Sequence, residues 1–179
     1  MPRVRQLTDK DAQSWTRKLF KKLEEGFGML PNMFRCMGNS DVALDGFMAF
    51  NAGMNAGKLG PKNVKMVILH TSELNKCEYC AAAHTKMALD AGVLTEEECL
   101  NARKGHGSDE KSTKMLEFAR KVKLTNGKVT DADIQAVRDA GFEDQEIIEI
   151  IGTISMIMFA NLTSNVAQPD LDFPAVPEL

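Results

Sequence analysis

The sequence lacks the features that mark several large classes of protein. Only 4 of its 179 residues are cysteine, far below the density of a disulfide-rich scaffold. Basic residues are not in excess, since 22 Lys and Arg stand against 25 Asp and Glu and the formal net charge is −3. Nucleic acids and anionic membranes select basic surfaces. We therefore expect no nucleic-acid partner and no membrane partner.

The N-terminal segment has no apolar stretch, because residues 1–6 run directly into charged sequence. We therefore expect no secretory signal and a location in the reducing cytoplasm. In that compartment, two closely spaced cysteines are more typical of a catalytic or metal-binding site than of a structural disulfide.

Signals for β-strands are nearly absent, whereas signals for helices recur along the chain. We expect helices at about 8–26, 40–56, 62–74, 77–92, 95–103, 108–122, 130–141 and 143–166, and a short turn or helical piece at 30–34. A chain of this length buries enough surface to fold without metal or disulfides. The prediction is an all-α, single-domain bundle of about eight helices over residues 1–179. Its core lies at about 28–167, and residues 168–179 form an extended tail.

The first and last helices carry the most specific expectations. Thr8 is suited to cap the first helix, whose inner face would contain Trp15 and Leu19. The last helix is apolar on almost all sides beyond Gly152, so it should be buried on all sides. Glu149 interrupts its short apolar run, so no membrane span is expected. A central core helix, a subunit interface or both remain open for it.

One motif, Glu73-x3-Cys77-x2-Cys80-x3-His84, carries chemistry. On an ideal helix these four side chains lie within about 60° of one another. The stripe would persist even with a break near Asn75. It brings together two thiols, an imidazole and a carboxylate, so these four residues are the candidate catalytic site.

The motif suits thiol redox chemistry because the thiolate is the reactive form of cysteine. Cys77 and Cys80 fall in the first turn of a predicted helix, whose dipole favours the anion, and this effect alone favours Cys77 as the thiol of lower pKa. His84 can accept or return a proton, and Glu73 can orient the imidazole. A sulfenic acid on one cysteine would be displaced by the other to give a disulfide. These are the parts of a thiol peroxidase and equally of a dithiol–disulfide oxidoreductase.

Two alternatives remain for the cysteine pair. A zinc site would use Cys77, Cys80 and His84 with a fourth ligand from Glu73, His70 or His106, although the second Cys/His pair of a zinc finger is missing. A buried structural pair would not be expected to share its stripe with a Glu and a His. A non-catalytic redox-sensing or metal-binding module is therefore the competing class of function.

The motif resembles the alkylhydroperoxidase D-like branch of the carboxymuconolactone decarboxylase superfamily. Residues 28–34, 59–62, 140–142 and 172–174 resemble further segments of its peroxidase-related members. The resemblance implies an all-α fold that assembles into dimers, trimers or hexamers. It also implies a thiol-dependent hydroperoxide reductase that needs no haem or flavin of its own. We expect no metal and no other cofactor.

The resemblance also implies roles for the motif residues. Cys80 would be attacked by the hydroperoxide and Cys77 would resolve the sulfenic acid, with a lipoylated or thioredoxin-like dithiol protein as reductant. One position departs from the family: its relay Glu, twelve residues before the first Cys, is Lys65 here. Glu73 is the carboxylate that would substitute, whereas a Lys would instead stabilise a thiolate by its charge. Lactone decarboxylation, the family's other activity, needs an arginine, which the motif lacks.

Overall fold

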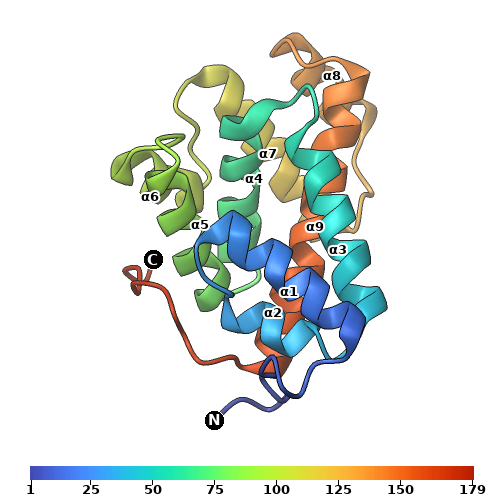
Figure 1. Cartoon of the computed structure of the whole chain (residues 1–179). Coiled ribbons are helices and arrows are strands. Elements are labelled where there is room, and N and C mark those ends of the chain that lie inside the picture. The colour runs from blue at the N-terminus through green and yellow to red at the C-terminus, as the bar shows by residue number, and fades with distance from the viewer.

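The computed structural model describes all 179 residues and contains only α-helices (Figure 1). The predicted all-α class is confirmed. There are nine helices rather than eight, because the short piece expected near residue 30 forms a helix of its own, α2. The nine helices are α1 (Ser14–Phe27), α2 (Asn32–Met37), α3 (Asp41–Asn55), α4 (Gly60–Leu74), α5 (Glu78–Asp90), α6 (Glu96–Lys104), α7 (Glu110–Thr125), α8 (Asp131–Asp139) and α9 (Asp144–Ala167).

Helix α4 lies at the centre of the bundle. It packs against α5, α6, α7 and α9, and every residue from Met66 to Ser72 is buried. Figure 1 shows α3 and α9 on one side of α4, and α5 and α6 on the other. Helix α5 also contacts α9. The start of α5, which carries the cysteine motif, is thus held by two central helices.

A buried carboxylate fixes the start of α4. Glu149 of α9 accepts the backbone N–H of Leu59 at 2.6 Å and the side-chain amide of Gln145 at 2.8 Å. Gly57 permits this approach, because a Cβ there would lie 2.7 Å from the carboxylate carbon. An anion at a helix N-terminus interacts favourably with the free amides and the helix dipole. The charge that interrupts the apolar sequence of α9 is therefore a cap for α4.

The first helix starts later than expected. The Thr8 hydroxyl donates to the Asp11 carboxylate at 2.7 Å, and the two residues form a separate turn before α1. The prediction that Trp15 faces inward is wrong, because Trp15 is 44% exposed and Thr16 is buried in its place. The small Thr16 side chain approaches Gly38, where an indole would not fit.

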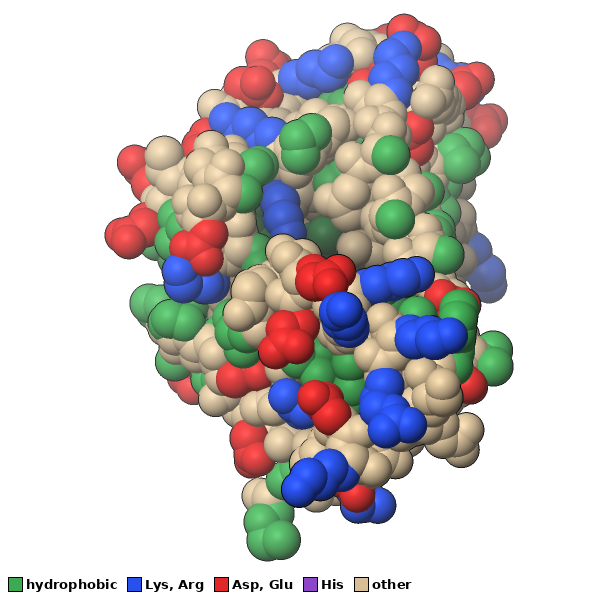
Figure 2. All heavy atoms as spheres, in the orientation of Figure 1, with side chains coloured by type: hydrophobic (Ala, Val, Ile, Leu, Met, Phe, Trp, Pro, Cys, Tyr) green, Lys and Arg blue, Asp and Glu red, His purple; other side chains and the backbone are tan.

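Figure 2 shows side chains of both charge signs intermingled over this face of the molecule.

Helix α9 is long and apolar enough to cross a membrane by length and composition alone, and 56% of its most apolar window is buried inside the protein. The core helix of a soluble bundle passes the same test. One face nevertheless remains exposed, with Ile148, Leu162 and Val166 each at least 58% accessible. The prediction of burial on all sides is therefore wrong for that face.

Candidate functional site

The cysteine pair lies at the junction between α4 and α5. Helix α4 ends at Leu74, and Lys76 adopts a left-handed backbone conformation with φ of 51°. Cys77 is then the N-cap of α5, and its Sγ accepts the backbone N–H of Cys80 at 3.3 Å. The two cysteines form a disulfide with Cα atoms 5.3 Å apart. The helix break near Asn75, allowed for by the sequence, is present.

Cys80 and His84 share the inward face of α5 and line one small cavity of about 40 Å³. Cys77 is not part of the lining. The other lining side chains are mostly aromatic or aliphatic: Phe27, Pro31, Met33, Phe34, Phe47, Asn51, Tyr79, Ala83, Met87, Ala160 and Phe173. The cavity therefore offers a substrate one sulfur and one imidazole in an apolar surrounding.

His84 is contacted by Lys65 from α4. The Lys65 Nζ lies 3.3 Å from the Nδ1 of His84, and both side chains are partly buried. Burial lowers the pKa of Lys65 to about 8. Burial, together with the nearby Lys65 charge, holds the pKa of His84 well below 6.5. Near neutral pH the imidazole is therefore uncharged.

Glu73 points to a different partner. Its Oε2 accepts from the Nε of Arg103 at 2.8 Å, and Arg103 also donates to the carbonyl oxygen of Pro177. The expectation that the stripe persists across a break near Asn75 is wrong for Glu73, because its carboxylate turns to Arg103 where α4 ends. The structure thus brings together Cys77, Cys80 and His84, and it places Glu73 in an ion pair with α6.

A polar network from α9 holds the α4–α5 junction. The buried Asn161 donates to Ser72 Oγ at 3.1 Å and accepts from Asn75 at 2.9 Å. Asn165 donates to the backbone carbonyl of Asn75 at 2.9 Å. Ser164 lies between these positions in sequence, and its Oγ is 3.7 Å from Cys80 Sγ.

These α9 residues are absent from the sequence-based site. A signal for them exists: they are polar residues at spacings of three and four in an otherwise apolar helix, which puts them on one face. The sequence does not indicate what that face contacts.

The C-terminal tail closes one side of the cavity. The Tyr79 hydroxyl donates to Asp172 at 2.6 Å and accepts the backbone N–H of Met33 at 3.2 Å. Burial and the adjacent Asp172 raise the pKa of Tyr79. Phe173 packs edge-on against the Tyr79 ring, with centroids 5.7 Å apart. Tyr79 therefore anchors the tail, and Phe173 becomes part of the cavity wall.

The remaining thiols and histidines do not join this site. Cys36 and Cys99 are buried free thiols, and burial raises the pKa of each. The Nδ1 of His70 lies 3.2 Å from the carbonyl oxygen of Arg103, and burial lowers its pKa. No three His, Cys, Asp or Glu side chains converge in an arrangement that holds a metal ion.

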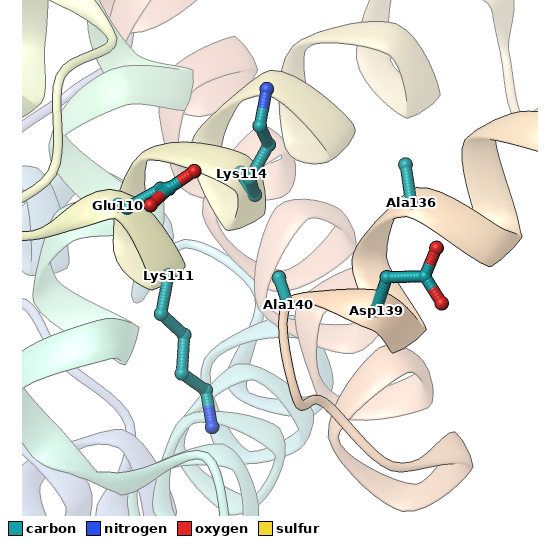
Figure 3. Close-up of a pocket in the computed structure, with 6 residues that line it drawn as sticks. All are labelled: Glu110, Lys111, Lys114, Ala136, Asp139 and Ala140. Atoms are coloured by element: carbon teal, nitrogen blue, oxygen red, sulfur yellow. The ribbon is translucent and has the colours of Figure 1, made fainter.

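A larger hollow between α7 and α8 has no set of side chains that converge on one point. It has a volume of about 500 Å³ and is lined by Glu110, Lys111, Lys114, Ala136, Asp139 and Ala140. Figure 3 shows the charged groups of Glu110, Lys114 and Asp139 directed apart rather than toward one point. The cavity at Cys80 is therefore the candidate functional site.

Comparison with known proteins agrees with this location. The carboxymuconolactone decarboxylase family matches residues 42–104, a segment that contains Lys65, both motif cysteines and His84. No curated protein matches the sequence significantly.

Solved structures share the fold at low sequence identity. An AhpD-core, uncharacterized peroxidase-related protein from Ralstonia eutropha JMP134 is 20% identical with a TM-score of 0.86, over 96% of this chain and 92% of that one. A peroxidase-related protein from Silicibacter sp. TM1040 is 21% identical with a TM-score of 0.80 over the same shares. A cysteine-to-alanine variant of the debrominase Bmp8, in complex with 2,3,4-tribromopyrrole, is 20% identical with a TM-score of 0.77, over 95% and 91%.

Proposed function

We propose that the chain belongs to the alkylhydroperoxidase D-like and carboxymuconolactone decarboxylase superfamily and reduces hydroperoxides with the thiols of Cys80 and Cys77. Residues 42–104 match the carboxymuconolactone decarboxylase family, and the fold matches AhpD-like peroxidase-related structures. The observation that carries the proposal is that Cys80 lines the cavity together with His84. Cys77 lies outside the cavity wall, at disulfide-bonding distance from Cys80. A hydroperoxide that enters the cavity would contact the Cys80 sulfur, and the Cys77 sulfur would be close enough to react with Cys80 afterwards.

The reaction then runs in two steps. The Cys80 thiolate attacks the terminal oxygen of the hydroperoxide, and the O–O bond breaks. The leaving alkoxide takes a proton from the His84 imidazole and becomes an alcohol. Cys80 is now a sulfenic acid. The Cys77 sulfur displaces its hydroxide, which leaves as water with the Cys77 proton, and the disulfide closes. The two thiols have lost two electrons and the hydroperoxide has gained them.

Return to the dithiol state requires a reductant with two thiols. The Cys80 amide that donates to Cys77 Sγ would stabilise a departing Cys77 thiolate, and a more stable thiolate leaves faster. A reductant would therefore attack Cys80, the sulfur next to the cavity. We propose a lipoylated or thioredoxin-like dithiol protein in this role, in the cytoplasm.

The cavity favours a small substrate. A volume of about 40 Å³ is a few times the roughly 10–15 Å³ needed for one water. Hydrogen peroxide or a short alkyl hydroperoxide would enter without rearrangement. A bulky hydroperoxide would have to displace an aromatic side chain such as Phe173.

The test is hydroperoxide consumption with dithiothreitol as reductant. We expect turnover by the native protein, none by Cys80→Ser, and none or a strongly reduced rate by Cys77→Ser. After one equivalent of peroxide, mass spectrometry should find the 77–80 disulfide in the native protein. Cys77→Ser should carry a dimedone-trapped sulfenic acid on Cys80.

Cys36→Ser serves as the matched control, because its thiol is buried outside the cavity. It should retain the native rate. Equal rates in all the cysteine variants would contradict the proposal. Stoichiometric zinc in protein purified without chelator, combined with no turnover, would instead support a metal-binding module.

Reductive dehalogenation is a second candidate function, favoured by the aromatic lining of the cavity and the similarity to Bmp8. In that reaction a thiolate takes the halogen from an aromatic ring, the ring carbon takes a proton, and the second thiol expels halide as the disulfide forms. Bromide release from a brominated pyrrole in the presence of dithiothreitol would identify it. Hydroperoxide turnover without bromide release would exclude it.

A further inference from the structure

The side chain of Lys65 faces one ring nitrogen of His84. Its Nζ lies 3.3 Å from His84 Nδ1, and both side chains are partly buried. A lysine ammonium has three N–H donors and no acceptor, so the nitrogen that faces it must accept. In a neutral imidazole the proton then sits on the other nitrogen, Nε2. A carboxylate at position 65 would have the opposite effect, because it would accept a proton from Nδ1 and leave Nε2 as a base.

No neighbouring charged group disturbs the contact between Lys65 and His84. Among the helices that pack against α4, α6 contributes the Cys99 thiol, which acts to raise the pKa of Lys65, and α5 contributes His84 with the cysteine pair. No charged group of α3, α7 or α9 alters the pKa of Lys65. Glu73, on the same helix, is engaged by Arg103. No carboxylate therefore neutralises the ammonium or competes for Nδ1.

We propose that Lys65 is a positioning residue that holds His84 as the Nε2–H tautomer, so that the imidazole acts as a proton donor to the leaving oxygen of the substrate. This role rests on the proposed hydroperoxide reductase function. As the O–O bond breaks, the alkoxide takes the Nε2 proton of His84, and Nδ1 takes a proton from Lys65. The imidazole remains neutral and Lys65 becomes an amine. Solvent then protonates Nε2, and Nδ1 returns its proton to Lys65.

The proposal predicts a specific pH dependence for the oxidation of the reduced protein by peroxide. Burial lowers the pKa of Lys65 to about 8, so the proton supply through His84 fails as the pH rises above 8. We expect the rate constant per Cys80 thiolate to fall over that range. General acid–base catalysis is worth about 10²–10⁴-fold, so Lys65→Met should lower the rate at pH 7 by at least about tenfold and remove the alkaline decline. Lys65→Arg should keep the Nε2–H tautomer but lower the rate and remove the alkaline decline, because a guanidinium does not give up a proton in this pH range.

The direct test is the tautomer of His84, read from long-range ¹H–¹⁵N correlations in the reduced, ¹⁵N-labelled protein. We expect Nε2–H in the native protein and in Lys65→Arg, a mixture in Lys65→Met, and Nδ1–H in Lys65→Glu. Lys86→Met is the matched control, because Lys86 is an exposed α5 residue paired with Asp90; it should leave both tautomer and rate unchanged. If Lys65→Glu does not fold, the Met and Arg variants suffice.

The outcomes separate the two proposals. A native His84 with its proton on Nδ1, or a Lys65→Met protein with native tautomer and native pH profile, would overturn the role of Lys65. Absence of hydroperoxide turnover with Nε2–H present would overturn the proposed function and the donor step, and would leave the positioning of His84 by Lys65 established.

Discussion

Ser164 is a residue outside the motif that contacts the Cys80 sulfur. Its hydroxyl lies 3.7 Å from Cys80 Sγ, and in the reduced protein it can donate to a thiolate and so favour the charged form. We expect Ser164→Ala to raise the pKa of Cys80 by up to about one unit, because one such hydrogen bond is worth about 1 kcal/mol. The measurement is the pH dependence of Cys80 alkylation in a Cys77→Ser background.

Ser155→Ala is the control for this prediction. Ser155 lies on the same helix, is exposed, and donates to the carbonyl oxygen of Ile151. It should leave the titration of Cys80 unchanged. A Ser164→Ala protein with the native alkylation profile would show that α9 does not influence the thiol.

At the same residue scale, the sequence predicts only the part of the site that one helix encodes. Cys80 and His84 are four residues apart on α5, so their common face follows from helical geometry. The left-handed backbone at Lys76 removes Glu73 from that face, and its partner Arg103 is 30 residues away. The contacts of Lys65 and Ser164 depend on how α4 and α9 are placed against α5, which spacing along one helix does not specify.

Among the helices, the capping of α4 by Glu149 can be tested through pH. Burial opposes ionisation of this carboxyl, but hydrogen bonds from Gln145 and the amides of Leu59 and Lys58 outweigh it and hold its pKa below 4.5. A carboxyl with a depressed pKa stabilises the fold above its unfolded pKa and loses that effect as the pH falls through the folded value. We expect Glu149→Gln to cost about 1–2 kcal/mol at pH 7 and to reduce the loss of stability between pH 6 and 3, measured by urea unfolding.

Two further variants define the Glu149 cap. Glu143→Gln changes an exposed carboxylate paired with Lys58, and it should change stability by less than about 1 kcal/mol. Gly57→Ala should destabilise the protein without removing any charge, since its Cβ would lie 2.7 Å from the Glu149 carboxylate carbon. A Glu149→Gln protein with the native stability at pH 7 and the native loss of stability between pH 6 and 3 would show that Glu149 does not stabilise the start of α4.

For the helices too, the sequence predicts features that neighbouring residues determine and does not predict features that depend on contacts between helices. Local signals predict some boundaries well: α6 begins at the capping box of Thr95 and Glu98, where a helix is expected. The start of α1 differs from the prediction because Thr8 and Asp11 bond to each other in a separate turn. The exposed face of α9 has no local signal, because apolar residues occupy both its buried and its accessible sides.

For the whole molecule, the C-terminal tail limits the size of the cavity. Asp172 accepts from Tyr79 and from the backbone N–H of Asn32, so the tail joins α5 to α2 and sets Phe173 in the cavity wall. We expect Phe173→Ala to raise kcat/KM for a bulky hydroperoxide such as cumene hydroperoxide several-fold relative to hydrogen peroxide. Leu171→Ala, an exposed tail residue, is the control and should leave the ratio unchanged. A native ratio in Phe173→Ala would show that the tail does not limit substrate size.

We propose that the exposed apolar residues of α9 and α3 form the interface of an oligomer of this chain. Helix α9 carries no charged residue beyond Glu149, and large uncharged patches on soluble proteins mark interaction surfaces. The exposed apolar residues of the two helices are Val42, Phe50, Ile148, Ile151, Phe159, Leu162 and Val166. We expect the native protein to sediment as a dimer or larger oligomer and Leu162→Glu to shift it toward monomer. Leu124→Glu places the same charge at an exposed leucine near the end of α7 and should keep the native assembly, whereas a monomeric native protein at high concentration would contradict the interface.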